Sequence, residues 1–231
     1  MRAIVLAGGL GTRLKGYIEK IPKALVPLNG KPLIEHVLGI LKRNGVKDIM
    51  ISVAYMKEKI TEALGDGKRL GLNISYIEEP EPLGTAGPLI ILAKEKKQIN
   101  ESFFVVNSDN LLEIDMKKMI HFHKSRKASC TIALVEVEKP ESYGGAVLEG
   151  DKIIEFVEKP KEKVSNFINS GYYIMEPEVF GIVEGMEKAM IEKDVFPVLA
   201  KKGKLYGFMC HGKWFDVGTP ERYAMAENEW R

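Results

Sequence analysis

The feature that most constrains this chain is a regular alternation of short apolar runs and helical patterns over its first 130 residues. The apolar runs are rich in β-branched residues, as in strands that are buried on both faces of a sheet. Strands separated by helices predict right-handed crossovers and a mainly parallel sheet. The expected strands are residues 2–7, 48–53, 74–77 and 103–107, and the expected helices are residues 33–41, 57–64, 88–97 and 116–127.

The pattern changes in the second half of the chain. Residues 130–138 alternate apolar and polar side chains, which is typical of a half-exposed strand. The turn Glu149-Gly150-Asp151 separates two short apolar runs and predicts a hairpin, because these residues tolerate positive φ. The sheet is therefore expected to become mixed. The remaining expected elements are the hairpin strands 143–148 and 152–156, the strands 167–175, 205–209 and 214–216, the short helices 177–183 and 194–201, and a last helix capped by Thr219 and Pro220.

Length and composition favour one globular domain over residues 1–231. The chain is 45% hydrophobic and 29% charged, which is far from the composition of a disordered protein. We predict a single α/β domain with a Rossmann-like, mainly parallel sheet, helices on both faces, and a mixed, hairpin-containing C-terminal part. Cys130 and Cys210 lack the spacing of a metal site and are predicted to be buried free thiols.

Charge and hydropathy exclude several classes of function. The net charge is only +2 and no long block of one sign occurs, which disfavours nucleic-acid binding. No run of about 18 apolar residues is present, and the N-terminal run is too short for a signal peptide, so we expect a cytoplasmic protein without a membrane span.

A glycine-rich loop directly follows the first expected strand. Its backbone N–H groups would line a concavity at the carboxyl edge of the sheet, which suits phosphate. The loop contains Gly8, Gly9, Gly11, Thr12 and Arg13. The guanidinium of Arg13 is a bidentate clamp for oxyanions, and Lys23 adds a second positive charge nearby.

Two common nucleotide-binding motifs do not fit this loop. Leu14 stands where a dinucleotide fold has its third glycine, and no acidic residue ends the second strand at Val53, which disfavours an NAD-binding oxidoreductase. A Walker loop is also excluded, because Pro32 follows Gly30 and Lys31 where a hydroxyl residue is required.

With these residues in view, the chain resembles the sugar-1-phosphate nucleotidyltransferases, also called nucleotide-sugar pyrophosphorylases. The resemblance spans nearly the whole chain. In chain order it is carried by LAGGLGTRL, PKALVPLNGKPLIEHVL, EEPEPLGTAGPL, VVNSDN, VEKP, INSGYYIM, EKDVFP and WFDVGTPERY. The LGTAG, EKDVFP and GKLYGF segments are most similar to the mannose-1-phosphate guanylyltransferase branch.

The resemblance implies a reaction and a set of site residues. A sugar-1-phosphate oxygen would attack the α-phosphorus of a nucleoside triphosphate with the help of Mg²⁺, giving an NDP-sugar and pyrophosphate; the first choice of substrates is GTP and mannose 1-phosphate. Ser108 replaces a glycine that is usual in the family. The implied residues are Arg13 and Lys23 for catalysis; Leu6, Ala7, Gly8, Gly9, Gly11, Thr12, Gly84 and Thr85 for the nucleotide; Gly144, Glu158, Lys159 and Asn169 for the sugar phosphate; and Asp109 and Asp216 for the metal.

Several alternatives stay open at this point. Uridylyl-, thymidylyl- and heptose guanylyltransferases share the same fold and reaction class, and a homo-oligomer is possible. A catalytically silent, nucleotide-sugar-binding regulatory subunit is a hypothesis of another class, and the retention of Arg13, Asp109, Lys159 and Asp216 argues against it.

Overall fold

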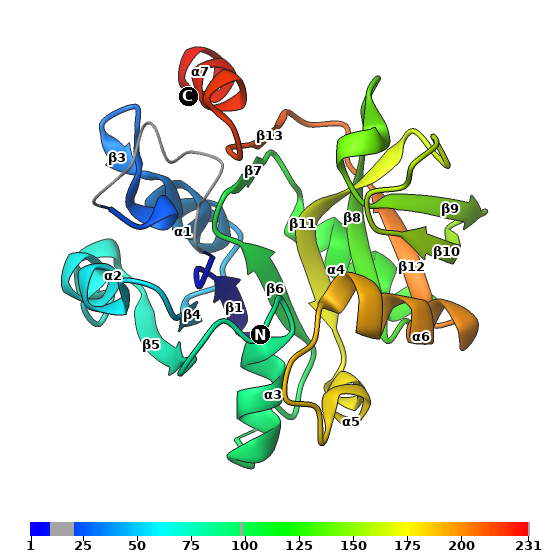
Figure 1. Cartoon of the computed structure of the whole chain (residues 1–231), viewed down its shortest axis with the longest axis horizontal. Helices are drawn as coiled ribbons and strands as arrows, with labels where there is room; N and C mark the ends of the chain where they lie inside the picture. Colours follow the sequence, from blue (N-terminus) through cyan, green and yellow to red (C-terminus); the bar gives the residue numbers. More distant parts are fainter. Residues whose placement is uncertain (10–20, 98, 231) are drawn as a thin grey trace. The chain divides into compact units, whose positions relative to one another are not determined.

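A computed structural model describes residues 1–9, 21–97 and 99–230 of the chain (Figure 1). The contacts between Cα atoms divide the chain into two compact units. Unit 1 consists of Met1–Pro82, Val106–Glu113 and Gly212–Arg231, and unit 2 consists of Leu83–Val105 and Ile114–His211.

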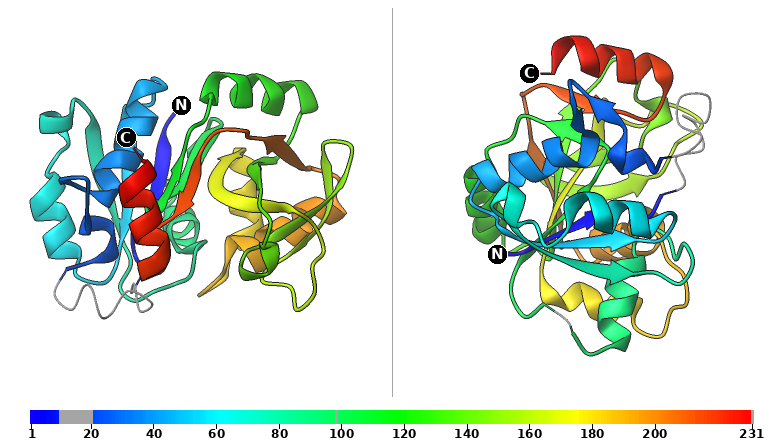
Figure 2. Two further views of the ribbon diagram at one scale, coloured as in Figure 1. Left: turned by 90° about the horizontal axis from the view of Figure 1, so that it is seen from above. Right: turned by 90° about the vertical axis from the view of Figure 1, so that its left-hand side faces the viewer.

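Unit 1 is built on three parallel strands in the order β5-β4-β1 (Figure 1). Their bounds are Ala3–Leu6 for β1, Asp48–Val53 for β4 and Asn73–Glu78 for β5. The connecting helices α1 (Leu33–Arg43) and α2 (Lys57–Leu64) lie on one face of these strands (Figure 2). This is the arrangement that two successive right-handed crossovers in one direction produce.

The helix α1 forms because its apolar side chains recur at helical spacing and all face the interior. Its six buried side chains are Leu33, Ile34, Val37, Leu38, Ile40 and Leu41. Lys42 and Arg43 lie in its last turn, where positive charge interacts favourably with the helix dipole.

The end of the chain completes unit 1. The short strands β7 (Asn110–Leu112) and β13 (Trp214–Asp216) form an antiparallel pair. The last helix α7 (Pro220–Glu229) packs against β13, and Figure 2 shows it in red. Thr219 caps α7 by accepting a hydrogen bond from the Arg222 N–H, as the sequence predicts. Tyr223 on α7 also donates to the carbonyl of Pro27 at 2.6 Å, in the small hairpin of β2 (Pro27–Leu28) and β3 (Lys31–Pro32).

Unit 2 contains a mixed sheet in the order β11-β8-β12-β10-β9. β12 is parallel to β8, whereas β11 is antiparallel to β8, β10 to β12, and β9 to β10. The bounds are Cys130–Glu136 for β8, Gly145–Glu149 for β9, Lys152–Val157 for β10, Phe167–Met175 for β11 and Leu205–Met209 for β12. β9 and β10 form the predicted hairpin, and β6 (Phe103–Asn107) runs from unit 2 into unit 1.

Two helices of unit 2, α4 (Met116–Arg126) and α6 (Phe196–Lys201), pack on this sheet with aromatic contacts. α4 packs on β8 and β12, where the rings of Phe122 and Phe208 lie 5.6 Å apart. α6 packs on β10 and β12, and its first residue, Phe196, contacts Phe156 and Tyr173 edge to face. The helix bounds are Gly87–Lys94 for α3, Met116–Arg126 for α4, Phe180–Val183 for α5 and Phe196–Lys201 for α6, which follows the π-helical turn η6 (Ile191–Val195).

One expectation about unit 2 is wrong. β8 is not half-exposed: its first six residues are buried, including Thr131. The reason is that α4 covers the face on which Thr131 lies, and His123 on α4 hydrogen-bonds the threonine hydroxyl at 2.8 Å. A polar residue in a strand therefore marks a satisfied interior position here, and not exposure to solvent.

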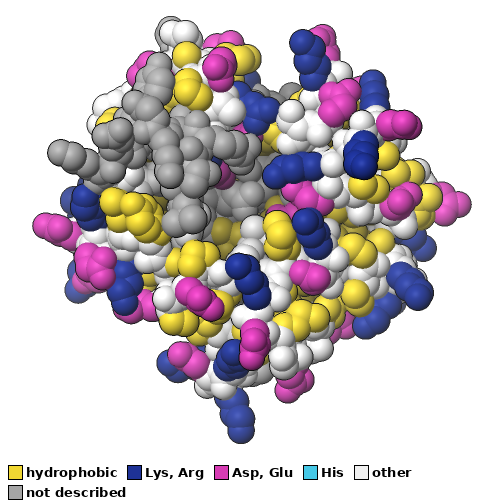
Figure 3. All heavy atoms as spheres, in the orientation of Figure 1, with side chains coloured by type: hydrophobic (Ala, Val, Ile, Leu, Met, Phe, Trp, Pro, Cys, Tyr) yellow, Lys and Arg dark blue, Asp and Glu magenta, His cyan; other side chains and the backbone are white. Residues whose placement is uncertain are grey.

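The predicted α/β class with a mixed C-terminal sheet is confirmed. Cys130 and Cys210 are buried and free, as predicted, and burial raises the pKa of the Cys210 thiol to about 12. Among the described residues, no helix has the length and apolar character needed to cross a membrane. On the face drawn in Figure 3, the positive and negative side chains that the structure describes are interspersed.

Candidate functional site

Strand pairing in unit 1 brings two aspartates together from distant parts of the sequence. Asp109 lies between β6 and β7, and Asp216 ends β13. In the β7–β13 pair, Asp216 is opposite Asn110, the residue that follows Asp109. The Val217 N–H also donates to the Asp109 carbonyl at 2.9 Å. The turn that follows β6 and the carboxyl end of β13 thus meet at one place.

Each of these aspartates has a cationic partner. Lys23, in the short 3₁₀ helix η2 (Lys23–Leu25), forms an ion pair with Asp109. Arg222, in the first turn of α7, donates to Asp216 Oδ2 at 2.5 Å. The side chains of Lys23 and Asp216 are only 14% and 13% exposed, so these charges are largely removed from solvent.

The two carboxylates suit a hard divalent cation. Among the residues that the structure describes, no group of three or more His, Cys, Asp and Glu side chains could hold a metal ion. Two carboxylates that leave the other positions to water and substrate phosphates match the coordination habit of Mg²⁺. Gly218 keeps the space beside Asp216 open, because a Cβ at this position would lie 2.8 Å from Oδ1 of the aspartate.

The described part of the glycine-rich segment lies at the carboxyl edge of the parallel strands. Ala7 N–H donates to the Ser52 carbonyl at 3.0 Å, and the Leu6 carbonyl accepts from Ser108 N–H at 3.1 Å. Gly8 and Gly9 follow without a helix. The other predicted loop residues, Gly11, Thr12 and Arg13, lie outside the described residues.

Glu79 is a functional candidate that the sequence analysis did not single out. It follows β5, is 7% exposed, and accepts a hydrogen bond from the Ser52 hydroxyl at 2.5 Å. A Cβ added at Gly8 would lie 3.4 Å from Glu79 Oε1. A buried carboxylate thus lines the start of the glycine-rich loop. The EEPEPLGTAGPL segment contains it, but no spacing rule distinguishes it from the exposed Glu78.

In unit 2, the predicted nucleotide residues Gly84 and Thr85 are bound to the segment that enters η6. Ala189 N–H donates to the Leu83 carbonyl at 2.9 Å, and Ala86 N–H donates to the Ala189 carbonyl at 3.1 Å. Gly84 has φ +90°, and a Cβ there would lie 2.2 Å from the Ala189 carbonyl oxygen. Only glycine fits this position without a backbone movement.

The four predicted sugar-phosphate residues also gather within unit 2. Asn169 N–H donates to the Gly144 carbonyl at 2.9 Å, and a Cβ at Gly144 would lie 2.8 Å from Glu158 Oε2. Lys159 follows with φ +49°, and its ammonium is 3.7 Å from Glu158 Oε1. The Lys159 side chain is 60% exposed, which leaves it able to reach a ligand.

Asn169 is held by its own neighbours. Its Nδ2 donates to the Tyr173 hydroxyl at 2.8 Å, and its Oδ1 accepts from the Gly171 N–H at 2.8 Å. These contacts span an irregularity in the register of β11 with β8 between Asn169 and Tyr173. The extra residues of β11 therefore fix the direction of the Asn169 side chain.

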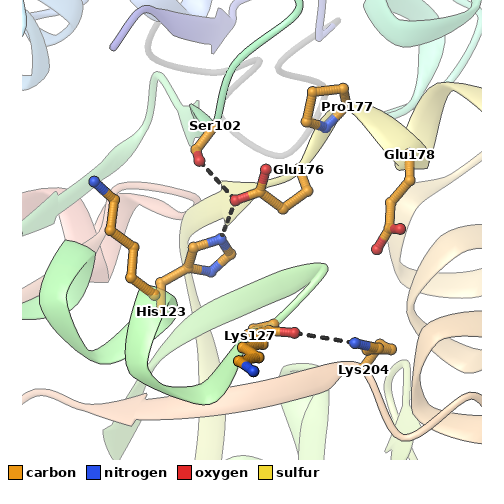
Figure 4. A pocket seen from close by; sticks show the side chains of 9 residues that line it. Ser102, His123, Lys127, Glu176, Pro177, Glu178 and Lys204 are labelled. Atoms are coloured by element: carbon orange, nitrogen blue, oxygen red, sulfur yellow. Dashed lines mark hydrogen bonds and ion pairs between the residues drawn. The ribbon is translucent and has the colours of Figure 1, made fainter.

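A separate pocket of about 540 Å³ lies near the amino ends of β6, β8 and β12 in unit 2 (Figure 4). At its centre, Glu176 Oε1 accepts a hydrogen bond from the Ser102 hydroxyl at 2.6 Å and lies 2.9 Å from His123 Nε2. Burial lowers the pKa of His123, and the bond to Glu176 raises it in part. None of the predicted site residues lines this pocket.

The comparisons with known proteins agree with this geometry. The family model described as "Nucleotidyl transferase" matches residues 2–231. The chain is 41% identical to a mannose-1-phosphate guanyltransferase of Saccharomyces cerevisiae, and 40% identical to a mannose-1-phosphate guanylyltransferase catalytic subunit beta of Danio rerio, with 96% of this chain covered in each case. The chain spans 63% and 62% of the length of these two relatives.

A solved structure resembles the whole chain. HddC from Yersinia pseudotuberculosis, complexed with GMP-PN, has a TM-score of 0.84 and 31% sequence identity. The match covers 100% of this chain and 99% of that chain. Because the family model covers nearly every residue, this chain belongs to the nucleotidyl transferase family.

Proposed function

We propose that this chain transfers a nucleoside monophosphate from a nucleoside triphosphate to a sugar 1-phosphate and releases pyrophosphate. The observation that carries the proposal is the pairing of β7 with β13, which brings together the backbone at Asp109 and the end of β13 at Asp216. Lys23 forms an ion pair with Asp109, and Arg222 with Asp216. Further support comes from the relatives named mannose-1-phosphate guanylyltransferases and from the neighbour complexed with GMP-PN. We further propose that both units act as one catalytic domain over residues 1–231, since the family model spans 2–231.

The reaction brings two anions together, and this defines what the residues must do. An oxygen of the sugar phosphate attacks the α-phosphorus, the bond from that phosphorus to the bridging oxygen of the β-phosphate breaks, and pyrophosphate leaves. At 4 Å two unit charges repel by about 4 kcal/mol at an effective dielectric constant of 20. Mg²⁺ held by Asp109 and Asp216 would supply positive charge to the triphosphate. Lys23 and Arg13 would add cationic contacts to it.

No side chain needs to act as the nucleophile, because the attacking phosphate oxygen is already ionised near neutral pH. The chain's contribution is therefore positioning. Lys159 would bind the sugar phosphate through its exposed ammonium. Glu158, Asn169 and the backbone at Gly144 would bind sugar hydroxyls, because they supply hydrogen-bond acceptors and donors within one part of unit 2.

Glu79 supports guanine as the base. An ionised carboxylate offers only acceptors, and guanine presents two adjacent donors, its N1–H and N2–H₂ groups. Uracil and thymine present a single N3–H donor on the corresponding edge. A buried carboxylate beside Gly8 therefore favours GTP over the pyrimidine nucleotides. Replacing Glu79 with Gln exchanges one acceptor for a donor, and we expect the preference for GTP in kcat/KM to fall by about tenfold.

A substrate panel tests the function. Purified wild-type protein is offered GTP, ATP, UTP and dTTP, each with mannose, glucose and other sugar 1-phosphates, and pyrophosphate release is measured with Mg²⁺ present. The Asp216→Asn variant is the matched control for contaminating activity. We expect turnover with GTP and mannose 1-phosphate that exceeds the UTP and dTTP rates by at least about tenfold.

The panel also separates the alternatives. A preference for UTP or dTTP would contradict the guanylyl assignment and keep the reaction class. Turnover that persists in excess EDTA would contradict the metal site at Asp109 and Asp216. No turnover of any pair by the wild type, with retained nucleotide-sugar binding, would instead indicate a regulatory subunit.

A further inference from the structure

The EKDVFP segment, residues 192–197, is one of the segments that resemble the family, and the proposed function gives it no role. It contacts both the nucleotide segment and the neighbours of the sugar-phosphate residues in unit 2. It contains most of η6 and the start of α6. At one end, Thr85 in the nucleotide segment donates its hydroxyl proton to Glu192 Oε2 at 2.5 Å. The same hydroxyl oxygen accepts from the Ile191 N–H at 2.8 Å. Thr85 is thus held by two groups of η6, one from the backbone and one from a side chain.

The other end of the segment packs beneath the sugar-phosphate residues. The Phe196 ring lies 5.0 Å from the ring of Phe156 and 5.3 Å from the ring of Tyr173, edge to face in both cases. Tyr173 holds the amide of Asn169, and Phe156 would be 2.4 Å from a Cβ at Gly144. Phe196 therefore packs against Tyr173 and Phe156. These two residues lie beside the proposed sugar contacts Asn169 and Gly144.

Glu192 is buried between these two regions. It is 7% exposed, which is rare for a glutamate that forms no ion pair among those the structure describes. Burial raises its pKa, the Thr85 hydrogen bond opposes this rise, and the nearby charges of Glu158 and Lys159 act in opposite directions. The carboxyl therefore lies within the electrostatic reach of the proposed sugar-phosphate pair.

The turn that carries Glu192 has a single well-defined geometry. Asp194 Oδ2 accepts from the Met190 N–H at 2.6 Å, and the Asp194 N–H donates to the Met190 carbonyl at 2.8 Å. This reciprocal pair closes the π-helical turn, a conformation found frequently at functional sites. Just before this turn, the backbone hydrogen bonds of Ala189 to Leu83 and Ala86 join the same segment to residues 83–87.

We infer that Glu192 is a positioning residue: through the Thr85 hydroxyl it holds the nucleotide segment, residues 83–87, in register with Glu158 and Lys159. The inference rests on the proposed function. In this inference the buried Glu192 carboxyl accepts the hydrogen bond from Thr85 and takes no part in the chemical step. A residue that only needs an acceptor oxygen tolerates glutamine, whereas one that transfers a proton does not.

Four variants and a control test this role. Thr85→Val removes the hydroxyl at nearly constant volume, and Thr85→Ser restores it. Glu192→Ala removes the acceptor, and Glu192→Gln keeps an acceptor oxygen without the charge. Thr61→Val is the matched control, since its hydroxyl bonds a local carbonyl on the exposed face of α2. GTP affinity is measured by titration calorimetry without sugar phosphate, and KM for both substrates and kcat by pyrophosphate release.

We expect Thr85→Val and Glu192→Ala each to weaken GTP binding and to raise both KM values by about tenfold, with a smaller change in kcat. Thr85→Ser and Glu192→Gln should stay within about threefold of the wild type. Because both residues form one contact, the double variant Thr85→Val with Glu192→Ala should be no worse than the weaker-binding single variant. A purely structural role would lower the melting temperature without this split between KM and kcat.

Two results would overturn the inference. One is unchanged GTP affinity and KM in folded Thr85→Val protein when the wild type turns over normally. The other is loss of kcat in Glu192→Gln with GTP affinity intact, which would place the carboxyl charge in the chemistry. Failure of the proposed function is distinguishable, because the wild type itself would then show no turnover in the substrate panel.

Discussion

Gly84→Ala is a sharp test of how the nucleotide segment is held. Two effects add in this variant. An alanine at φ +90° costs about 1–2 kcal/mol, because the left-handed region crowds its Cβ. The Cβ would also lie 2.2 Å from the Ala189 carbonyl oxygen, where contacts under 3.0 Å force a movement. Moving that backbone disturbs two hydrogen bonds, each worth about 0.5–1.5 kcal/mol. The total loss in the free energy of unfolding is therefore about 2–5 kcal/mol.

A second glycine in the same unit separates these two effects. Gly185 has φ +79°, and a Cβ there meets no atom within 4 Å, so Gly185→Ala pays only the conformational cost of about 1–2 kcal/mol. The assay is equilibrium urea denaturation of both variants, followed by GTP titration of the folded proteins. We expect Gly84→Ala to be clearly less stable than Gly185→Ala and to bind GTP at least about tenfold more weakly. Equal stability of the two variants, with GTP affinity unchanged, would refute the steric argument.

Three further predictions concern charge. Asp109→Asn and Asp216→Asn should each lower turnover by roughly 10² or more, and the double variant should be little worse than the worse single one, as measured by pyrophosphate release. Lys159→Ala should raise KM for the sugar phosphate by about tenfold and leave GTP affinity unchanged in calorimetry; the reverse pattern would assign the lysine to the nucleotide. Burial raises the pKa of Glu192 above 4.5, so the native state binds more protons than the unfolded state between pH 4.5 and that raised value. The wild-type free energy of unfolding should therefore fall as pH rises through this window, and urea denaturation of Glu192→Gln should show a smaller fall.

The sequence predicted the elements whose residues obey a simple periodicity. The bounds of β4, α2, β6 and β11 match their expected ranges, because continuous apolar runs and helical spacing are local properties. The same patterns place Asp109 just after the expected strand 103–107 and Asp216 at the end of the expected strand 214–216. They do not predict β7 or its pairing with β13, because β7 has only three residues and its partner is about a hundred positions away.

The residues that sequence reasoning missed are polar groups buried by tertiary contacts. A glutamate in a charged motif such as EKDVFP is normally exposed, and only the packing of η6 against residues 83–87 encloses Glu192. Thr131 is misread for the same reason, since the covering helix supplies His123 as its partner. Periodicity describes one segment at a time and does not include the partner that satisfies a buried polar atom.

Unusual backbone geometry in unit 2 coincides with the residues proposed to contact substrate. Lys159 has φ +49°, Gly84 has φ +90°, and η6 is a π-helical turn. The left-handed backbone of Lys159 costs on the order of 1–3 kcal/mol and persists only where surrounding contacts over-determine it. Gly84 adopts its positive φ without that cost, because it has no Cβ. The fully buried rings of Tyr173 and Phe196 pack edge to face, and the Tyr173 hydroxyl accepts a hydrogen bond from the Asn169 amide. Rigid aromatic packing thus fixes the proposed sugar contact Asn169, which is what a site that works by positioning requires.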